Sequence, residues 1–531
     1  MWLVTGGAVA AASAFSGCSG GFDSCKADKN CGPYDGGAAG TAGAAGSAGR
    51  GGSGGSAGQS GAGGQGGSGS GEGGMSGFAG EAGAAGAAGG GVEPCDTTKT
   101  PTEEACLVSD AYAVFVAPNG KDIAAGTMAA PFATLSNAIT MAGGAKFVIV
   151  CDETYDEHVV VSEGAVVYGG FSCTGGQWAT EPGAPLFKPS DAGPALKIDG
   201  VSKSVAIETV NFEVPDAKVA GGSALTALVN ASPSVTLRNV RLTAGAGMNG
   251  ADGTLELFSY VAQASLNGNA ESAAGVGGAE KDCACQSGLM SVGGVGGTPA
   301  SSGQNGSKGL PDHSGGAGGD PTFGDCSAGS GGKKGGDAAV TPPAVGAATL
   351  GTISSTGWLP TSAVDGANGS PGQGGGGGAS LNNAGHGGGG GCGGCGGNGA
   401  KAGQGGGGSI ALVAVNSPVT LDGCTLTSKD AGNGGAGHVG QPGQQTAGGG
   451  GNAINTLNSC GGGAGGKGGD GGASGGGAGG VSVGVVWKGA LAPTLTNSTT
   501  MTGKAGTKGI GGVPTMNDGI AGVKQDTLQV P

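Results

Sequence analysis

The sequence predicts an all-β protein, a right-handed parallel β-helix interrupted by long glycine-rich insertions. One nine-residue pattern recurs, with apolar residues at positions one, three, six and eight. Apolar residues two apart lie on one face of a strand, and the step of three marks a bend after which the next strand again points inward. The copies begin at Val205, Val235 and Val419, with a weaker one at Pro493. Because a short apolar strand precedes each copy, the pattern is typical of one corner of a solenoid rung.

The spacing between copies decides where the glycine belongs. The stretch from Ile207 to Leu237 has the length of about one rung, whereas the stretches from Leu237 to Leu421 and from Leu421 to Leu495 are several times longer. Loop-closure entropy grows only logarithmically with length, and a stack of rungs tolerates loops between its repeats. We therefore expect the glycine blocks to be insertions between rungs. Residues 254–260 are a further candidate strand inside the first block.

Glycine dominates the composition. The 531 residues include 134 Gly and 23 Pro, and only 4% are aromatic and 11% charged. Such a chain has little apolar side-chain area with which to build one large core. The glycine blocks are not collagen, because Pro is scarce and the triplet period breaks. Two alternatives remain for them, disorder or bundled extended helices with closely packed backbones.

Order is predicted to begin near Cys95. Strands are expected at 114–116, 147–150, 158–161 and 166–171, and a short capping helix within 132–141, where Leu135 and Ile139 have helical spacing. Pro118, Asn119 and Gly120 form a predicted turn. Further strands are expected at 195–198, 225–229, 410–415 and 481–487.

Residues 112–243 resemble the opening of bacterial β-helix proteins of the DUF1565 and pectin-lyase-like group. The likeness rests on the run from Phe115 to Gly120, on Pro131 to Leu135, and on Tyr168 to Phe171 followed by Trp178. The resemblance implies the fold and carries little about function. The later glycine blocks are similar in composition alone to the repeats of PGRS-type proteins.

The N-terminus has the form of an export signal. Residues 1–17 are apolar and end in small residues before Cys18, and the run from Phe15 to Ser19 resembles a bacterial lipobox. We expect Cys18 to be lipidated and the chain to be anchored in the cell envelope, at the outer membrane or cell surface. An ordinary secretory signal cleaved nearby is the alternative. No Lys or Arg precedes the apolar run, so the true start codon is also open.

The charge and the cysteines bound the partners and the compartment. A net charge of −14 with only three arginines argues against nucleic acid, which leaves the membrane, an extracellular polysaccharide or surface proteins. Fourteen cysteines suit an oxidising compartment. Two short-range pairs are predicted, Cys25 with Cys31 and Cys95 with Cys106. The other disulfide candidates are Cys151, Cys173, Cys283, Cys285, Cys392 and Cys395.

No constellation in the sequence carries a catalytic assignment. The best cluster of carboxylates, Asp152, Glu153, Asp156 and Glu157 beside His158, lies in a turn between predicted strands. Glu208, Arg238 and Asp422 share one repeat position, which indicates a solvated ion pair across a sheet. Cys392 and Cys395 form one CxxC pair, whereas a zinc ribbon needs two such pairs. The run 465–470, which ends at Asp470, matches the start of the calcium-binding nonapeptide repeat, but Gly472 stands where that repeat needs an apolar residue. His313 and His438 have no acidic partner nearby. We predict no catalytic residue, metal or cofactor.

The predicted organisation follows from these interpretations. It consists of a signal peptide at 1–17, a flexible Gly/Ala/Ser-rich tether at 18–94, a capped β-helix region at 95–244, insertions at 245–408 and 429–480, a rung at 409–428, and a C-terminal rung and tail at 481–531. The favoured function is an anchored structural or surface-display protein that adheres through its glycine-rich loops. The alternative is a carbohydrate-active protein, either a polysaccharide lyase or hydrolase or a protein that binds polysaccharide.

Overall fold

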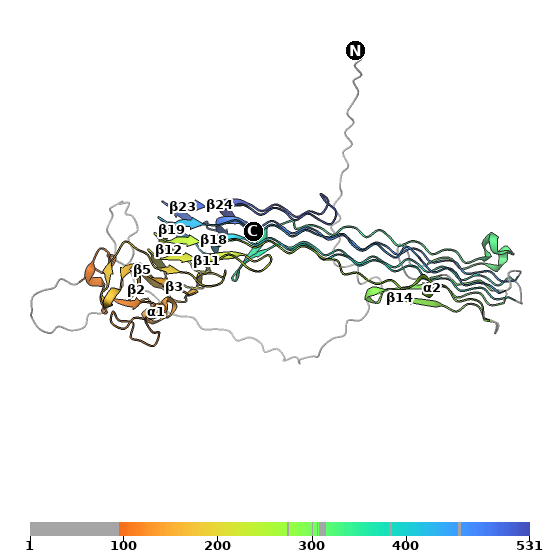
Figure 1. Ribbon diagram of the computed structural model, residues 1–531, viewed down its shortest axis with the longest axis horizontal. Coiled ribbons are helices and arrows are strands. Elements are labelled where there is room, and N and C mark those ends of the chain that lie inside the picture. The colour runs from red at the N-terminus through yellow and green to blue at the C-terminus, as the bar shows by residue number, and fades with distance from the viewer. Residues whose placement is uncertain are drawn as a thin grey trace, which may run out of the picture. The chain divides into compact units, whose positions relative to one another are not determined.

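The computed structural model describes residues 95–531 except 273–275, 300, 305, 307–314, 382–384 and 455–457. Cys18, Cys25, Cys31, the signal peptide and the tether therefore lie outside the described residues. The described chain is mostly β, with parallel sheets and few helices (Figure 1). Apart from two short hairpins, its strands form three sheets whose members come from successive passes of the chain, which is the arrangement of a parallel β-helix.

Sheet A carries the first half of the repeat. Its parallel strands are β1 (Ala113–Val116), β2 (Phe147–Cys151), β5 (Ala165–Ser172), β9 (Val205–Glu208), β12 (Val235–Arg238), β19 (Val419–Asp422) and β22 (Thr494–Thr496). A short strand, β6 (Ala179–Thr180), pairs antiparallel with β5.

Sheets B and C complete each turn of the coil. Sheet B contains β3 (Thr154–Tyr155), β7 (Leu186–Phe187), β10 (Asn211–Glu213), β13 (Arg241–Thr243), β20 (Thr425–Thr427) and β23 (Thr499–Met501). Sheet C contains β4 (Val159–Val161), β8 (Leu196–Asp199), β11 (Ala224–Asn230), β18 (Ser409–Val415), β21 (Ser482–Lys488) and β24 (Lys524–Gln529). From β3 onward the chain visits the sheets in the order B, C, A and returns to B.

The predicted corner lies where the repeat steps by three. Val205 and Ile207 are buried in β9, and Phe212 is buried in β10 of the next sheet. Between them Thr209 has a φ of 55°, and Asn239 and Asn497 at the matching positions have 50° and 51°. Asn tolerates this left-handed conformation better than most residues. The spacing of two, three and two between the apolar positions of the repeat therefore indicates two strands joined by a residue in the left-handed conformation.

The interior of the coil is a continuous apolar stack. Tyr155, Phe187 and Phe212 come from consecutive rungs of sheet B, and their ring centroids are separated by 4.7 and 5.5 Å. Their stack continues into Leu242 and Leu426, both fully buried. One apolar side chain per rung at each position is what a solenoid needs to bury a core from local repeats.

One end of the coil is covered by the helix α1 (Leu135–Ala142). Thr134 accepts a hydrogen bond from the N–H of Asn137 at its start, and Gly143 has a φ of 56° at its end. Leu135, Ala138, Ile139 and Ala142 are buried in the core. The predicted capping helix is present, with both of its bounds moved slightly towards the C-terminus.

The neighbouring strands β11, β18 and β21 of sheet C are apolar on both faces. In β18 every residue is buried, because Leu412 points into the coil while Ile410 and Val413 pack against a second cluster outside it. A hairpin of β16 (Gly351–Ser354) and β17 (Gly357–Pro360) covers this outer cluster with Trp358. This hairpin belongs to the first insertion, so the insertion completes a core that the rungs alone leave exposed.

The insertions leave the coil at one corner. Residues 244–408, 428–481 and 502–523 each follow a sheet B strand, β13, β20 or β23, and each leads to the next sheet C strand, β18, β21 or β24. The expected strand at 254–260 is wrong, since these residues are extended without ladder pairing and are followed by α2 (Gln263–Leu266). The first insertion instead contains the hairpin of β14 (Lys281–Ala284) and β15 (Met290–Gly293).

Candidate functional site

The insertions form an ordered body, which we call the glycine bundle. Figure 1 shows its extended segments running side by side away from the strands of the coil. Between the two alternatives, disorder and bundled extended helices, the structure has the second for the described residues. The segments are 244–253, 268–272, 294–299, 316–319, 332–347, 361–379, 387–408, 430–451, 460–480 and 503–522.

Hydrogen bonds between these segments recur every third residue. Segment 387–408 donates to segment 460–480 from Gly391, Gly394 and Gly397 in turn, at 2.9, 2.9 and 3.0 Å. Three residues per turn without internal hydrogen bonds is the geometry of the polyproline II helix. None of these segments belongs to a described strand. The bundle is thus held by lateral backbone hydrogen bonds and not by an apolar core.

Successive residues of one segment bond to different neighbours. Within 460–480 three consecutive residues reach three separate segments, as three-fold symmetry about a polyproline II helix requires. The three bonds are Gly462 to Gly451 at 3.0 Å, Gly463 to Gly376 at 2.7 Å, and Gly335 to the carbonyl of Ala464 at 2.9 Å. A central segment is therefore surrounded by bonded neighbours, which makes the bundle a three-dimensional lattice of backbones.

Close packing explains why the bundle is glycine. A Cβ added to Gly466 would lie 1.8 Å from the carbonyl oxygen of Gly336, and one added to Gly477 would lie 2.0 Å from that of Gln404. Real Cβ atoms do not approach oxygens so closely, and the blocking atoms belong to backbone that cannot rotate away. Outer segments meet neighbours on fewer sides, so glycine there is needed once per turn, as at 503, 506, 509 and 512.

Asp and Asn side chains complete the bundle at its surface. Asp430 accepts a hydrogen bond from the N–H of Lys504 at 2.7 Å, and Asn433 accepts one from Thr507 at 2.8 Å. Asp337 accepts one from Lys467 at 2.8 Å, and that backbone N–H is the main cause that holds the pKa of Asp337 below its ordinary value. The carboxylates of Asp430 and Asp337 and the amide oxygen of Asn433 thus accept from backbone N–H groups that have no backbone acceptor in the described part of the chain.

Among the described residues, three disulfides cross-link the bundle. Cys392 and Cys395 are three apart, hence on one face of a helix with three residues per turn. Cys283 of β14 and Cys285, which continues the extended chain just after β14 ends, are two apart and hence on one face. The two pairs therefore face each other and join as Cys283–Cys392 and Cys285–Cys395, with Cα separations of 6.2 and 5.4 Å. The third bond, Cys326–Cys460, is absent from the sequence-based pairs, since nothing in the spacing of these two residues relates them.

Two further disulfides lie beside the coil. Cys151 of β2 is bonded to Cys173, in an outer cluster where the rings of Phe115 and Trp178 lie 4.8 Å apart. Cys95 is bonded to Cys106 across eleven residues. Cys424 is the one free cysteine among the described residues and is buried in the coil at the repeat position of Val240.

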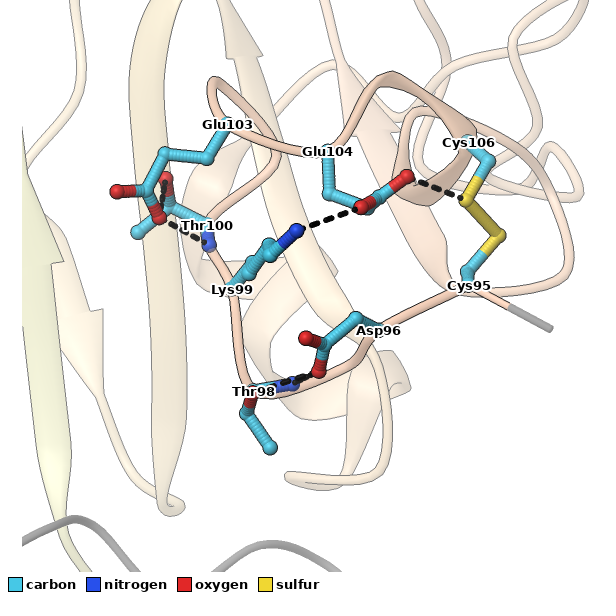
Figure 2. A network of polar contacts seen from close by, with 8 residues as sticks. All are labelled: Cys95, Asp96, Thr98, Lys99, Thr100, Glu103, Glu104 and Cys106. Carbon is cyan, nitrogen blue, oxygen red and sulfur yellow. Dashed lines mark hydrogen bonds and ion pairs between the residues drawn. A yellow bond between two sulfur atoms is a disulfide. The ribbon is translucent and has the colours of Figure 1, made fainter. Parts of the chain in front are cut away.

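The Cys95–Cys106 loop is stiffened by local polar contacts (Figure 2). Asp96 accepts hydrogen bonds from the N–H and hydroxyl of Thr98 at 3.0 and 2.6 Å, and Glu103 accepts two from Thr100, both at 3.0 Å. Lys99 pairs with Glu104 at 3.4 Å. The turn contacts lower the pKa values of Asp96 and Glu103. These ionisable groups serve the geometry of the loop.

The acidic cluster considered for catalysis does not converge on a site. The carboxylate of Glu157 accepts the N–H groups of Leu135 and Ser136, each at 2.9 Å, and so caps the N-terminus of α1. His158 lies 3.4 Å from Asp191 and 2.9 Å from the carbonyl of Pro194. Asp156 and Glu157 line a small cavity of about 190 Å³ beside Pro118 and Tyr155. Glu157 is thus part of the scaffold.

The repeat-position charges do stack as the sequence indicates. Tyr168, Glu208, Arg238 and Asp422 are aligned on consecutive strands of sheet A. Arg238 lies 4.0 Å from Glu208, with both side chains partly exposed, as in a weak surface pair. Burial, with the nearby charge of Glu103, raises the pKa of Glu208 against the opposing effect of Arg238.

The remaining candidates are dispersed. Asp470 accepts the N–H of Gly443 at 2.8 Å on the bundle surface, and His438 contacts the carbonyl of Val439. His386, close in sequence to Cys392, donates its backbone N–H to the hydroxyl of Ser459 at 3.2 Å. His313 is outside the described residues. Among the described residues, no group of three or more His, Cys, Asp and Glu side chains could hold a metal ion. No helix in this part of the chain is long and apolar enough to span a bilayer.

Comparison with known proteins gives no relative that would explain this geometry. No family model, no curated protein and no solved structure matches the chain. The class defined by fold and site is therefore a mostly β protein with parallel sheets and a disulfide-linked glycine bundle. The signal that sequence reasoning missed is the glycine spacing of three within the insertions, which marks the polyproline II period.

Proposed function

We propose that this protein is a structural and surface-display protein of the cell envelope, anchored by lipidation of Cys18, with the glycine bundle as the element it presents. The right-handed winding of the coil, the usual hand of parallel β crossovers, is part of the same proposal. The likeness of residues 112–243 to β-helix proteins of the DUF1565 and pectin-lyase-like group supports the fold and leaves the activity open.

One observation carries the proposal. The three insertions are built into a lattice that three disulfides cross-link, whereas the ionisable side chains considered for catalysis serve as caps and surface pairs. Disulfides of this kind persist in oxidising compartments. A body stabilised by backbone bonds and cross-links suits mechanical presentation outside the reducing cytosol, where a flexible loop would not hold a shape.

The anchor is tested by mass spectrometry of the N-terminal peptide from membrane-purified protein. We expect a diacyl or triacyl mass on Cys18 and loss of the Cys18→Ala variant to the soluble fraction. The matched control is Cys25→Ala, which removes a neighbouring cysteine and should stay in the membrane. An unmodified Cys18, or a Cys18→Ala variant that remains membrane-bound, would remove the anchor from the proposal.

Display is tested on intact cells with a membrane-impermeant amine reagent. Lys401 and Lys467 have exposed side chains on the glycine bundle and should be labelled without lysis. A lysine of a periplasmic marker protein provides the control that the outer membrane is intact. Labelling of the bundle only after lysis would place it inside the envelope and would contradict surface display.

A further inference from the structure

The ladder between two described segments of the glycine bundle is interrupted, and the interruption forms a groove. Gly253 donates to the carbonyl of Ala436, and Gly268 donates to that of Gly449. Between these two bonds the outer segment runs from 253 to 268 and the inner segment from 436 to 449, so the outer segment is longer by two residues. The bulge that this excess creates, at 254–267, is where the bundle departs from its own regularity.

Two glutamines hold the bulge open. Gln441 and Gln444 are buried, and their side chains take the place of the missing backbone partners. The amide of Gln441 accepts from the N–H of Phe258 at 2.8 Å and donates to its carbonyl at 2.7 Å, and Gln444 donates to the carbonyl of Val261 at 2.8 Å. Residues 258 and 261 are three apart, as are 441 and 444, so the glutamine contacts keep the three-residue period of the ladder. They separate the two backbones by the length of one glutamine side chain.

The resulting groove, which we call the bulge groove, is open to solvent and has a volume of about 580 Å³. Its described walls come from both segments and include no Asp, Glu, Lys, Arg or His. The lining residues are Leu257, Tyr260–Gln263 and Gln441–Thr446. The lining side chains are therefore apolar, hydroxyl or amide, and the nearby carboxylate of Asp470 accepts the N–H of the lining residue Gly443 at 2.8 Å.

An aromatic ring is fixed in this groove. The hydroxyl of Tyr260 donates to the carbonyl of Pro442, and its ring meets that of Phe258 edge-on at a centroid distance of 5.7 Å. Leu257 and Val261 beside it remain 73% and 39% exposed. A ring held by hydrogen bonding and packing loses little conformational entropy when a ligand lies against it.

We propose that the bulge groove binds an uncharged polysaccharide chain. A sugar ring presents C–H groups on its faces and hydroxyls around its edge, which match the Tyr260 ring together with the side-chain amides of Gln263 and Gln445 that also line the groove. The amide nitrogens donate to the carbonyls of Ala447 and Gly443, so the amide oxygens are the groups that would accept from sugar hydroxyls.

An anionic ligand finds no countercharge among the lining residues and meets the nearby carboxylate of Asp470. A fully apolar ligand would stay in contact with water, because Leu257 in this groove is mostly exposed. The site is independent of the display role, because neither Cys18 nor cell-surface location enters the argument.

The test is affinity electrophoresis of the full chain in gels containing laminarin or dextran as neutral probes and polygalacturonate as the charged probe. We expect retardation by at least one neutral probe, insensitive to salt, and none by polygalacturonate. Tyr260→Ala should weaken the retention at least tenfold. Leu257→Asp changes an exposed side chain without disturbing the fold and should also weaken it, by placing a charge in the groove.

The matched control is Val364→Ala, which shortens an exposed valine (51% exposed) of the bundle outside the groove and should bind as the unmodified chain does. Equal retention of Leu257→Asp and the parent would overturn the proposal. So would migration unaffected by both neutral probes, or retention by polygalacturonate that salt abolishes. Membrane anchoring of the same variants reports on the proposed function separately and is expected to be unchanged.

Discussion

Leu237 and Leu421 are separated in the chain by the whole first insertion, yet they occupy adjacent positions in one parallel ladder. Their neighbours Arg238 and Asp422 keep the same register, so the long insertion neither shifts nor breaks the coil. Leu421 is followed by Leu495 in the same way after the second insertion. One chain therefore builds both the coil and the bundle: each pass adds a rung to the coil, and the insertions between passes supply the segments of the bundle.

The first prediction concerns a buried glycine of the bundle. Gly477→Ala places a Cβ 2.0 Å from the carbonyl oxygen of Gln404, and relief requires the two segments to move apart. We expect a loss of about 1–3 kcal/mol in the free energy of unfolding, measured by urea denaturation. Ala464→Ser, an exposed change in the same segment, should stay within about 0.5 kcal/mol of the parent. Equal stability of the two variants would contradict close backbone packing.

The coil could be predicted from the sequence because each rung repeats one side-chain rule. Apolar residues alternate where a strand has one buried face, and the corner adds one residue. The runs that begin at Val205 and Val235 therefore predict two short strands joined by a corner, and these runs pair in register. The outer hairpin that carries Trp358 could not be predicted in this way, because it packs on sheet C by tertiary contacts alone.

The sequence could not distinguish an ordered bundle from disorder in the insertions. The hydrogen bonds of the bundle join glycines such as Gly463 and Gly376, which have no side chain that could indicate the pairing. The disulfide of Cys326 with Cys460 depends on the same lattice, which brings together residues 134 apart in the chain. The groove at Tyr260 arises from a two-residue bulge, which is visible only once the two registers of the ladder are compared.

The second prediction is that the Cys326–Cys460 disulfide of the bundle contributes more to stability than the Cys95–Cys106 disulfide outside it. Replacing both Cys326 and Cys460 by Ala opens a loop of 134 residues and should destabilise the bundle by about 2–5 kcal/mol. Hydrogen exchange of the glycine-rich peptides would report the loss, since exchange follows local opening. The matched control is the double replacement of Cys95 and Cys106, a loop of eleven residues, which should cost less. Faster exchange in the control than in the bundle variant would refute the ranking.

The third prediction concerns the buried thiol of Cys424. Burial raises its pKa above the ordinary thiol value of 9.0, so the neutral thiol is favoured in the folded state. Its contribution to stability is complete below that value and declines as the pH rises through the higher folded pKa. Native protein at pH 8 should resist iodoacetamide at Cys424, and urea-unfolded protein should react. Cys424→Val, which introduces the residue found at Val240 of the preceding rung, should fold and should not lose stability at alkaline pH. Rapid alkylation of Cys424 in the native chain would contradict its burial.

The fourth prediction separates capping from catalysis at Glu157. Glu157→Gln keeps the size of the side chain but replaces a charged double acceptor of the N–H groups of Leu135 and Ser136. We expect a loss of about 0.5–2 kcal/mol in stability, as for other helix N-caps, read by thermal unfolding. Asp156→Asn, the exposed neighbour, should have little effect. A stability equal to that of the parent would mean that the end cap does not depend on this carboxylate.

The fifth prediction follows from the raised pKa of Glu208. Since its folded pKa lies above the ordinary carboxyl value, its neutral form is favoured by folding, and the stability it contributes at low pH is lost as the pH rises through the folded pKa. Glu208→Gln should therefore be neutral or slightly stabilising at pH 7, with the difference vanishing in acid. Arg238→Gln should be destabilising at pH 7, because it leaves the ionised carboxylate of Glu208 without its countercharge.

A double-mutant cycle over Glu208 and Arg238 completes this argument. The two groups are 4.0 Å apart and both side chains are partly exposed, so we expect a coupling free energy below about 1 kcal/mol that shrinks with added salt. A coupling of several kcal/mol, or Glu208→Gln destabilising the chain at pH 7, would show that the pair holds sheet A together. In that case the charges of Glu208, Arg238 and Asp422 would have to be reconsidered as an element that stabilises the fold and not as part of its solvated outer face.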